Sequence, residues 1–279
     1  MCLFRFAASR IQQFFIVLWR SWLTVIRDPA SLKLRALQTI MISLVFGLIY
    51  LRQNLDQEGV MNINGFLFIL VTNMSFSSQF IVINIFPMEI PVFQREYDSK
   101  LYSIEIYFLC KTLADIPFQI LFPFIFITID YWMIGLYDDV SKYLIACGIV
   151  ILVSNVAASF GYMVSCIART VTAALALAPP LMIPLMIFGG IFVNNKSIPS
   201  YFVWLKYLSW FKYATEILTV DQWIDVKNIT CNEEPCIQFY NSLFIIYLSI
   251  YLSIYLSIYL SIYVCLSFRI YSLLYGYIT

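Results

Sequence analysis

Long apolar segments are the feature of this sequence that most constrains its fold. A helix needs roughly 18 or more predominantly apolar residues to cross about 30 Å of hydrocarbon. The segments of this kind are 34–51, 65–86, 116–136, 143–167, 171–193 and 239–266. Only 12% of all residues are charged, and these segments lack the charged faces of soluble amphipathic helices. The chain is therefore predicted to be an all-α membrane protein with a bundle of six transmembrane helices.

The distribution of basic residues predicts the orientation of the bundle. Net charge is only +1, so bulk charge does not point to nucleic acid or to acidic partners. With the N-terminus inside, eleven of the 17 basic residues, including eight of the nine arginines, fall on the cytosolic side. This bias predicts a multi-pass protein with a cytosolic N-terminus. The first 20 residues do not have the pattern of a cleavable signal peptide.

Residues 1–33 are predicted to be a cytosolic segment that contains one amphipathic helix. Between Ile11 and Val25, apolar residues fall on one face, opposite Gln13, Arg20 and Arg27. That face consists of Ile11, Phe14, Phe15, Leu18, Trp22 and Val25. An interfacial helix at the membrane surface is the favoured interpretation, and an ordinary cytosolic helix is the alternative.

Residues 87–115 hold the densest cluster of mixed charges between two apolar segments. Such a cluster is expected to face water, either as a functional segment or only as a determinant of topology. Asp115, at its end, and Asp130 lie near the ends of the third span, where proton coupling is conceivable. Snorkelling of both carboxylates to the interface is the expectation.

Two of the predicted spans have unusual compositions. The second carries a heavy polar load, which either joins helices or contacts a substrate. These polar residues are Asn73, Ser75, Ser77, Ser78, Gln79 and Asn84. The fifth contains Pro179, Pro180 and Pro184, followed by the pair Gly189-Gly190, so it is predicted to bend, as a moving element or as a static kink.

The outer loop, 194–238, is too apolar to be an ordinary hydrophilic connection. Its aromatic run predicts re-entrant or interfacial helices before the last span, with Tyr201, Trp204, Tyr207, Trp210 and Tyr213 at the headgroup level.

Possible modification sites follow in the same outer loop. Asn195 and Asn228 begin glycosylation sequons. Cys231 and Cys236 form a disulfide if the compartment is oxidising, or else stay free thiols.

The tail, 239–279, is of low complexity. Its core is four copies of the quartet Tyr-Leu-Ser-Ile from Tyr247 to Ile262. A tetranucleotide TATC repeat read in frame encodes this quartet. The tail is therefore either a sixth span or an artefact of gene prediction that replaces the true C-terminus.

Several kinds of catalytic chemistry are not encoded in these 279 residues. The sequence has no histidine, so histidine-based triads and metal sites are excluded. It also has no Cys-x-x-Cys pair and no phosphate-binding loop. No catalytic residue, metal site or cofactor is therefore predicted for this chain, and it is not expected to hydrolyse ATP alone.

From about Ala8 to Cys236 the chain resembles the transmembrane domain of white-type ABC half-transporters, the G subfamily. Six stretches in the same order carry the resemblance. They are Leu18-Trp-Arg-Ser-Trp22, Gly59-Val-Met-Asn-Ile-Asn-Gly65, Glu89-Ile-Pro-Val-Phe-Gln-Arg-Glu96, Tyr107-Phe-Leu-Cys-Lys-Thr-Leu-Ala-Asp-Ile-Pro117, Phe188-Gly-Gly-Ile-Phe-Val-Asn194 and Tyr207-Leu-Ser-Trp-Phe-Lys-Tyr-Ala-Thr-Glu216. The chain departs from the family's pattern at Asp130, where an uncharged residue is usual, and after Cys236, where the last span of the family is lost.

The resemblance implies an ABC-2 type transmembrane domain over 34–238 that works as a homo- or heterodimer. It implies an ATP-binding domain, with ATP and Mg, that is missing from this chain. Substrate would bind between the second and fifth spans, and the segment 87–115 would be the coupling loop. By motif, Asn73, Phe76, Ile183 and Met186 would line the cavity, Ile191 and Phe192 would form the outer gate, and Glu89, Arg95, Glu96 and Tyr102 would belong to the coupling loop.

The transported molecules would be small amphiphiles such as pigment precursors, sterols or other lipids, in the plasma membrane or an intracellular vesicle membrane. Two alternatives stay open at this point. One is a non-functional fragment or dominant-negative partner, and the other is an ATP-independent channel or scaffold.

Overall fold

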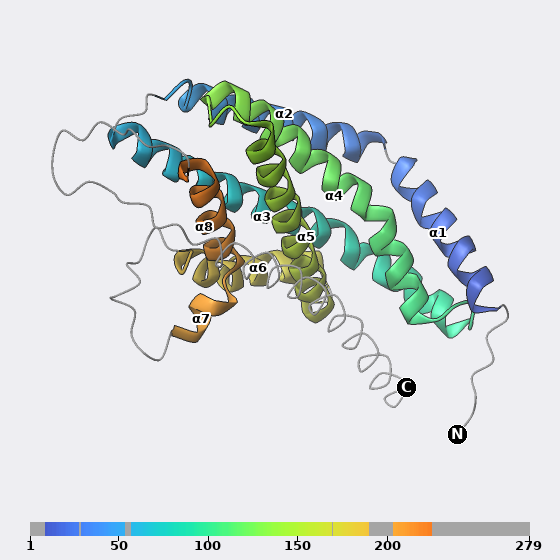
Figure 1. Cartoon of the computed structure of the whole chain (residues 1–279). Coiled ribbons are helices and arrows are strands. Elements are labelled where there is room, and N and C mark those ends of the chain that lie inside the picture. Colours follow the sequence, from blue (N-terminus) through green and yellow to red (C-terminus); the bar gives the residue numbers. More distant parts are fainter. Residues whose placement is uncertain (1–8, 28, 54–56, 169, 190–202, 225–279) are drawn as a thin grey trace.

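The computed structural model describes residues 9–27, 29–53, 57–168, 170–189 and 203–224 (Figure 1). Within these ranges the secondary structure is helical, which confirms the predicted all-α class. The helices are α1 (Arg10–Ile26), α2 (Pro29–Ile49), α3 (Gln57–Asp98), α4 (Ile104–Ile134), α5 (Val140–Ala168), α6 (Val171–Ile187), α7 (Val203–Leu208) and α8 (Trp210–Trp223).

Five of these helices correspond to predicted spans. Helices α2 to α5 are long and apolar enough to cross a membrane, and α6 is a shorter apolar helix of 17 residues. The last four residues of the predicted fifth span, and the whole of the sixth, lie outside the described residues. The prolines of α6 lie inside the helix, which begins with a cap from Thr170 Oγ1 to the Ala173 N–H at 3.3 Å.

The prediction that 87–115 forms a loop is wrong. Helix α3 continues through Pro87 and Pro91 to Asp98, and α4 already begins at Ile104, so only 99–103 is non-helical. A proline removes one backbone hydrogen bond, but neighbouring turns keep theirs, and Glu, Gln and Arg are good helix formers. At 1.5 Å per residue, the 42 residues of α3 extend about 63 Å, roughly twice the hydrocarbon thickness.

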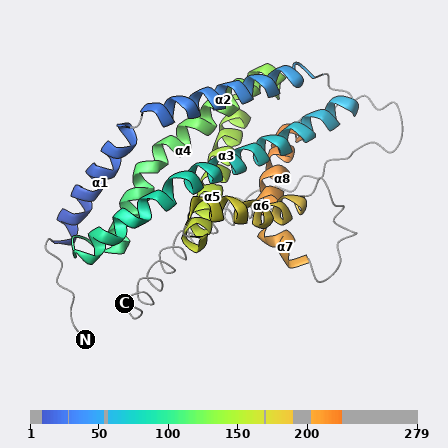
Figure 2. The ribbon, with the colours of Figure 1, turned by 180° about the vertical axis from the view of Figure 1, so that it is seen from behind.

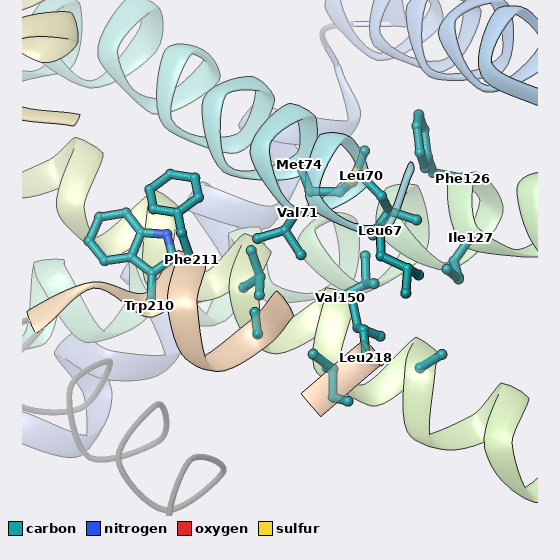
Figure 3. Close-up of a cluster of buried hydrophobic side chains, with 14 of the residues drawn as sticks. Leu67, Leu70, Val71, Met74, Phe126, Ile127, Val150, Trp210, Phe211 and Leu218 are labelled. Carbon is teal, nitrogen blue, oxygen red and sulfur yellow. The ribbon is translucent and has the colours of Figure 1, made fainter. Parts of the chain in front are cut away.

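Helices α3 and α5 form the centre of the bundle, and α8 packs against both (Figure 3). The main core joins side chains from α3, α4, α5, α6 and α8. Those labelled in Figure 3 are Leu67, Leu70, Val71, Met74, Phe126, Ile127, Val150, Trp210, Phe211 and Leu218. At Gly161, α5 approaches α3 so closely that a Cβ atom would lie 3.0 Å from the Gln79 carbonyl oxygen.

The position of Trp210 corrects the expectation that it lies at the headgroup level. Trp210 is 3% exposed, and its indole N–H donates to Ser75 Oγ on α3 at 3.2 Å. The buried indole therefore has its polar partner inside the bundle. Trp204 and Tyr207 on α7 are exposed. Tyr201 lies outside the described residues, and whether α7 and α8 are re-entrant stays a prediction.

Helices α1 and α2 run along one side of the bundle, next to α4 (Figures 1 and 2). The buried stripe of α1 consists of Gln13, Val17 and Ser21, whereas Ile11 and Phe15 are 71% and 63% exposed. The predicted apolar face is therefore only partly packed, because Phe14 and Leu18 contact a buried core and Trp22 contacts Phe118. The packed stripe can be polar because Gln13 Oε1 accepts a hydrogen bond from the Ser103 N–H, at the start of α4, at 3.2 Å.

Neither aspartate of α4 snorkels, which corrects the expectation for Asp115 and Asp130. Asp130 is 0% exposed, and its Oδ1 is hydrogen-bonded to Ser43 Oγ of α2 at 2.9 Å. Asp115 accepts a hydrogen bond from Tyr162 of α5 at 2.5 Å. Both carboxyl groups therefore point into helix contacts, where each has one hydrogen-bonding hydroxyl group from another helix.

Candidate functional site

The densest polar contacts lie where α1, α3 and α4 meet, beside the turn 99–103. Arg20 of α1 places Nη1 2.7 Å and 2.8 Å from the two carboxylate oxygens of Glu96, near the end of α3. The Tyr102 hydroxyl donates to Glu96 and accepts a hydrogen bond from Arg20 Nη2 at 3.4 Å. One carboxylate thus connects α1 to the turn between α3 and α4.

Burial, hydrogen bonds and charge together set the protonation states of Tyr102 and Arg20. Burial, and next the hydrogen bond to Glu96, raise the pKa of Tyr102, so its phenol stays protonated and donates. Burial lowers the pKa of Arg20, but the hydrogen bonds and charge interactions with Glu96 and Tyr102 together outweigh burial, so the net change in this pKa is upward. Arg20 therefore stays a cation, as the ion pair requires.

A second ion pair joins Glu89 of α3, seven residues before Glu96, to Lys111 of α4. Glu89 accepts hydrogen bonds from Lys111 Nζ at 2.8 Å and from the Tyr107 hydroxyl at 3.1 Å. Lys111 Nζ is also 3.8 Å from Asp115, which accepts from Tyr162 of α5. The Lys111 side chain is only 8% exposed. This second pair connects α3, α4 and α5.

Aromatic rings fill the space between the two ion pairs. The ring centroid of Phe93 lies 4.5 Å from that of Tyr107 and 6.2 Å from that of Tyr102. Tyr102 and Tyr107 stack at 5.9 Å with an interplanar angle of 13°. The two ion pairs and the rings between them form one contiguous group, here called the hairpin cluster: Arg20, Glu89, Phe93, Glu96, Tyr102, Tyr107 and Lys111.

We expect Lys111→Met to destabilise the protein by about 3 kcal/mol, because removal of one partner leaves buried charge uncompensated. Glu89 and Asp115 would face each other's charge without the ammonium group between them. Thermal unfolding of the detergent-solubilised protein measures the effect. Lys33→Met, at an exposed lysine of α2, is the control and should be near neutral. Equal stabilities of the two variants would contradict the assigned role of Lys111.

The hairpin cluster contains three of the four residues predicted for coupling, namely Glu89, Glu96 and Tyr102. Arg95 has an exposed side chain, and its carbonyl oxygen accepts hydrogen bonds from Ser99. Sequence reasoning missed Arg20 and Lys111 as partners. One signal was available, since Glu89 and Glu96 are seven residues apart and therefore share a face of a helix.

The four predicted cavity residues lie on α3 and α6, which pack against each other. Asn73 and Phe76 belong to a half-buried stripe of α3, where Phe76 stacks on Phe80 at 5.9 Å. Phe76 and Met186 pack against the main core, whereas Ile183 is 42% exposed. These residues thus line a partly exposed surface of the single chain, and their contact with substrate stays a prediction.

The remaining predicted site residues lie outside the described residues. They are the gate residues Ile191 and Phe192, the sequon residues Asn195 and Asn228, and the cysteines Cys231 and Cys236. Among the described residues, no group of three or more His, Cys, Asp or Glu could hold a metal ion.

Long apolar helices, joined by buried polar contacts, define a multi-pass helical membrane protein. The chain belongs to the ABC-2 type transporter family, whose model matches residues 12–223. This confirms the resemblance on which the transporter prediction rests.

Relatives with white-type names support the same assignment. Protein white of Ceratitis capitata is 49% identical over 82% of this chain and 34% of its own length. Protein white of Drosophila melanogaster is 46% identical over the same shares. The ABC transporter ATP-binding protein/permease wht-1 of Caenorhabditis elegans is 39% identical over 80% of this chain and 33% of its own length. The chain thus spans about a third of the length of these relatives.

Proposed function

We propose that this chain is the membrane-spanning part of a G-subfamily half-transporter that moves small amphipathic molecules across a membrane. The observation that carries the proposal is the family match over 12–223, together with relatives of which one is named as an ATP-binding protein and permease. ATP hydrolysis would take place in a domain outside this chain. We assign ATP and Mg²⁺ to that domain because this sequence has no phosphate-binding loop.

The hairpin cluster is proposed to pass the motion of that ATP-binding domain to the bundle. Coupling between distant sites needs a physically connected element with two arrangements. The cluster supports this role because its ion pairs and stacked rings connect α1, α3, α4 and α5. A displacement of the turn 99–103 would therefore move several helices together.

Substrate would bind on the α3–α6 surface, completed by the same surface of a second half-transporter in a homo- or heterodimer. The proposal is supported by the half-buried positions of Asn73 and Phe76 on α3 and by the packing of α3 against α6, where Met186 contacts the same core as Phe76. An amide among aromatic and thioether groups suits planar amphiphiles such as pigment precursors, and the apolar part of the surface suits sterols or other lipids. We place the protein in the plasma membrane or a vesicle membrane, with its N-terminus in the cytosol.

The direct test is uptake of amphipathic compounds into vesicles that contain the full-length protein. Uptake should require ATP and should stop when the catalytic glutamate of the ATP-binding domain is replaced. Uptake that survives this replacement would contradict an ATP-driven mechanism and favour a channel.

Phe76→Ala should weaken substrate binding about tenfold, since it removes an aromatic contact from the proposed surface. The measurement is the concentration dependence of uptake, with basal ATPase activity expected to stay within about twofold. Phe124→Ala, at a 41% exposed phenylalanine on α4, is the matched control. If both variants change uptake equally, the α3–α6 surface is not the binding site.

A further inference from the structure

Asp130 is a fully buried carboxyl group outside the hairpin cluster and outside the proposed substrate surface. It lies on α4 against Ser43 of α2, and both residues are 0% exposed. Ser43 Oγ is 2.9 Å from Asp130 Oδ1 and 3.4 Å from the carbonyl oxygen of Phe126. Among the described residues, Asp130 Oδ2 is enclosed and has no hydrogen-bond partner.

The close contact between α2 and α4 explains this enclosure. Thr39, Ser43 and Gly47 are spaced four residues apart and form the buried stripe of α2. A Cβ atom at Gly47 would lie 2.7 Å from Met133 Sδ of α4. Small residues let helices approach closely, so Asp130 is shielded on the α2 side without space for solvent.

Charged partners that could stabilise an ionised Asp130 are remote. Arg35 of α2 lies about two turns before Ser43, over the ring of Phe122 at 4.3 Å. Trp22 of α1 packs against Phe118 of α4. Phe118 lies about three turns before Asp130 on the same helix. The titratable groups on α1, α2 and α5, on the residues directly after α1 and α2, and on α4 itself are Arg10, Arg20, Arg27, Lys33, Arg35, Tyr50, Arg52, Glu105, Tyr107, Cys110, Lys111, Asp115, Tyr131, Lys142, Tyr143, Cys147, Tyr162 and Cys166. None of the ion pairs within the described part of the chain includes Asp130.

A count of donors favours the protonated form of Asp130. Ser43 has one hydroxyl hydrogen but lies next to two acceptors, and the Phe126 carbonyl can only accept. If Asp130 is a carboxylate, one of these contacts has no hydrogen, and a buried negative charge has a single donor at most. If Asp130 carries a proton on Oδ1, it donates to Ser43, and Ser43 donates to Phe126. Both contacts are then hydrogen bonds.

We propose that Asp130 is a proton-binding site, and that its neutral acid form fastens α2 to α4 through Ser43. The proton is taken from water when the helices pack. Ionisation would require α2 to move away or water to enter the seam. Because α2 follows α1 directly, the bound proton would also fix the helix next to the hairpin cluster.

Infrared difference spectroscopy on the full-length protein at neutral pH tests the proposal. Subtracting the spectrum of Asp130→Asn should show one protonated-carboxyl band that is present only in the wild type. Asp98→Asn, at an exposed aspartate, should remove carboxylate bands alone. Loss of only carboxylate bands in Asp130→Asn would overturn the proposal.

A second variant covers the case in which Asp130→Asn does not fold. Ser43→Ala removes the acceptor, so the protonated-carboxyl band should shift to higher frequency relative to the wild type. A purely structural role for Ser43 would leave that band unmoved. Absence of any shift, or of any protonated-carboxyl band across a pH series of the wild type, would also refute the assignment.

Discussion

Gly161→Leu should prevent stable folding of the membrane domain. The two central helices touch at this glycine, where a Cβ atom would lie 3.0 Å from the Gln79 carbonyl oxygen and 3.2 Å from Val82 Cβ. The first of these is backbone and cannot rotate away, so α3 and α5 must separate. Overpacking of this kind costs about 3 kcal/mol or more, which is a large part of the stability of a typical domain. The measurement is the yield of monodisperse protein in detergent, followed by thermal unfolding.

Gly148→Leu is the matched control for this prediction. Gly148 is on the same helix, and a Cβ atom there meets nothing within 4 Å. The control should therefore keep the yield and melting temperature of the wild type. If the two leucine variants behave alike, α3 and α5 do not pack through Gly161.

The presence of the apolar helices α2 to α6 could be predicted from sequence because hydrocarbon thickness imposes one length requirement on every crossing helix. The ends of α3 and α4 could not be predicted in this way. Charges and two prolines made 87–115 resemble a loop, but charged side chains are compatible with helix, and Pro87 and Pro91 cost only local hydrogen bonds. Hydropathy reports where a helix leaves the hydrocarbon, which is a different position from where the helix ends.

The partners within the hairpin cluster were less predictable than its location. Arg20 and Glu96 are 76 residues apart, so their pairing depends on how α1 docks. The predicted apolar face divides between protein contact and exposure, since Phe14 and Leu18 pack against a buried core while Ile11 and Phe15 stay exposed. Hydrophobic periodicity cannot distinguish an apolar face that meets protein from one that meets another surface.

Glu96→Lys should reduce ATP-driven transport at least about tenfold while leaving the fold intact. The substitution puts a cation opposite Arg20 and removes the acceptor of the Tyr102 hydroxyl, so α1 is no longer fixed to the turn 99–103. The stability cost should stay near 1 kcal/mol, because the Arg20 side chain is 46% exposed and such ion pairs contribute little. Transport and ATP hydrolysis should therefore be measured separately on the full-length protein, and hydrolysis is expected to continue without transport.

Two further variants distinguish coupling from a general effect of charge. Arg95→Glu changes the adjacent residue, whose side chain is exposed, and should transport within about twofold of the wild type. The exchange Arg20→Glu with Glu96→Arg restores opposite charges across the same gap and should recover much of the lost transport, since double replacement isolates the pairwise interaction. Failure of the exchange, together with equal losses in Arg95→Glu and Glu96→Lys, would mean that charge on this hairpin matters for a reason other than the contact between α1 and α3.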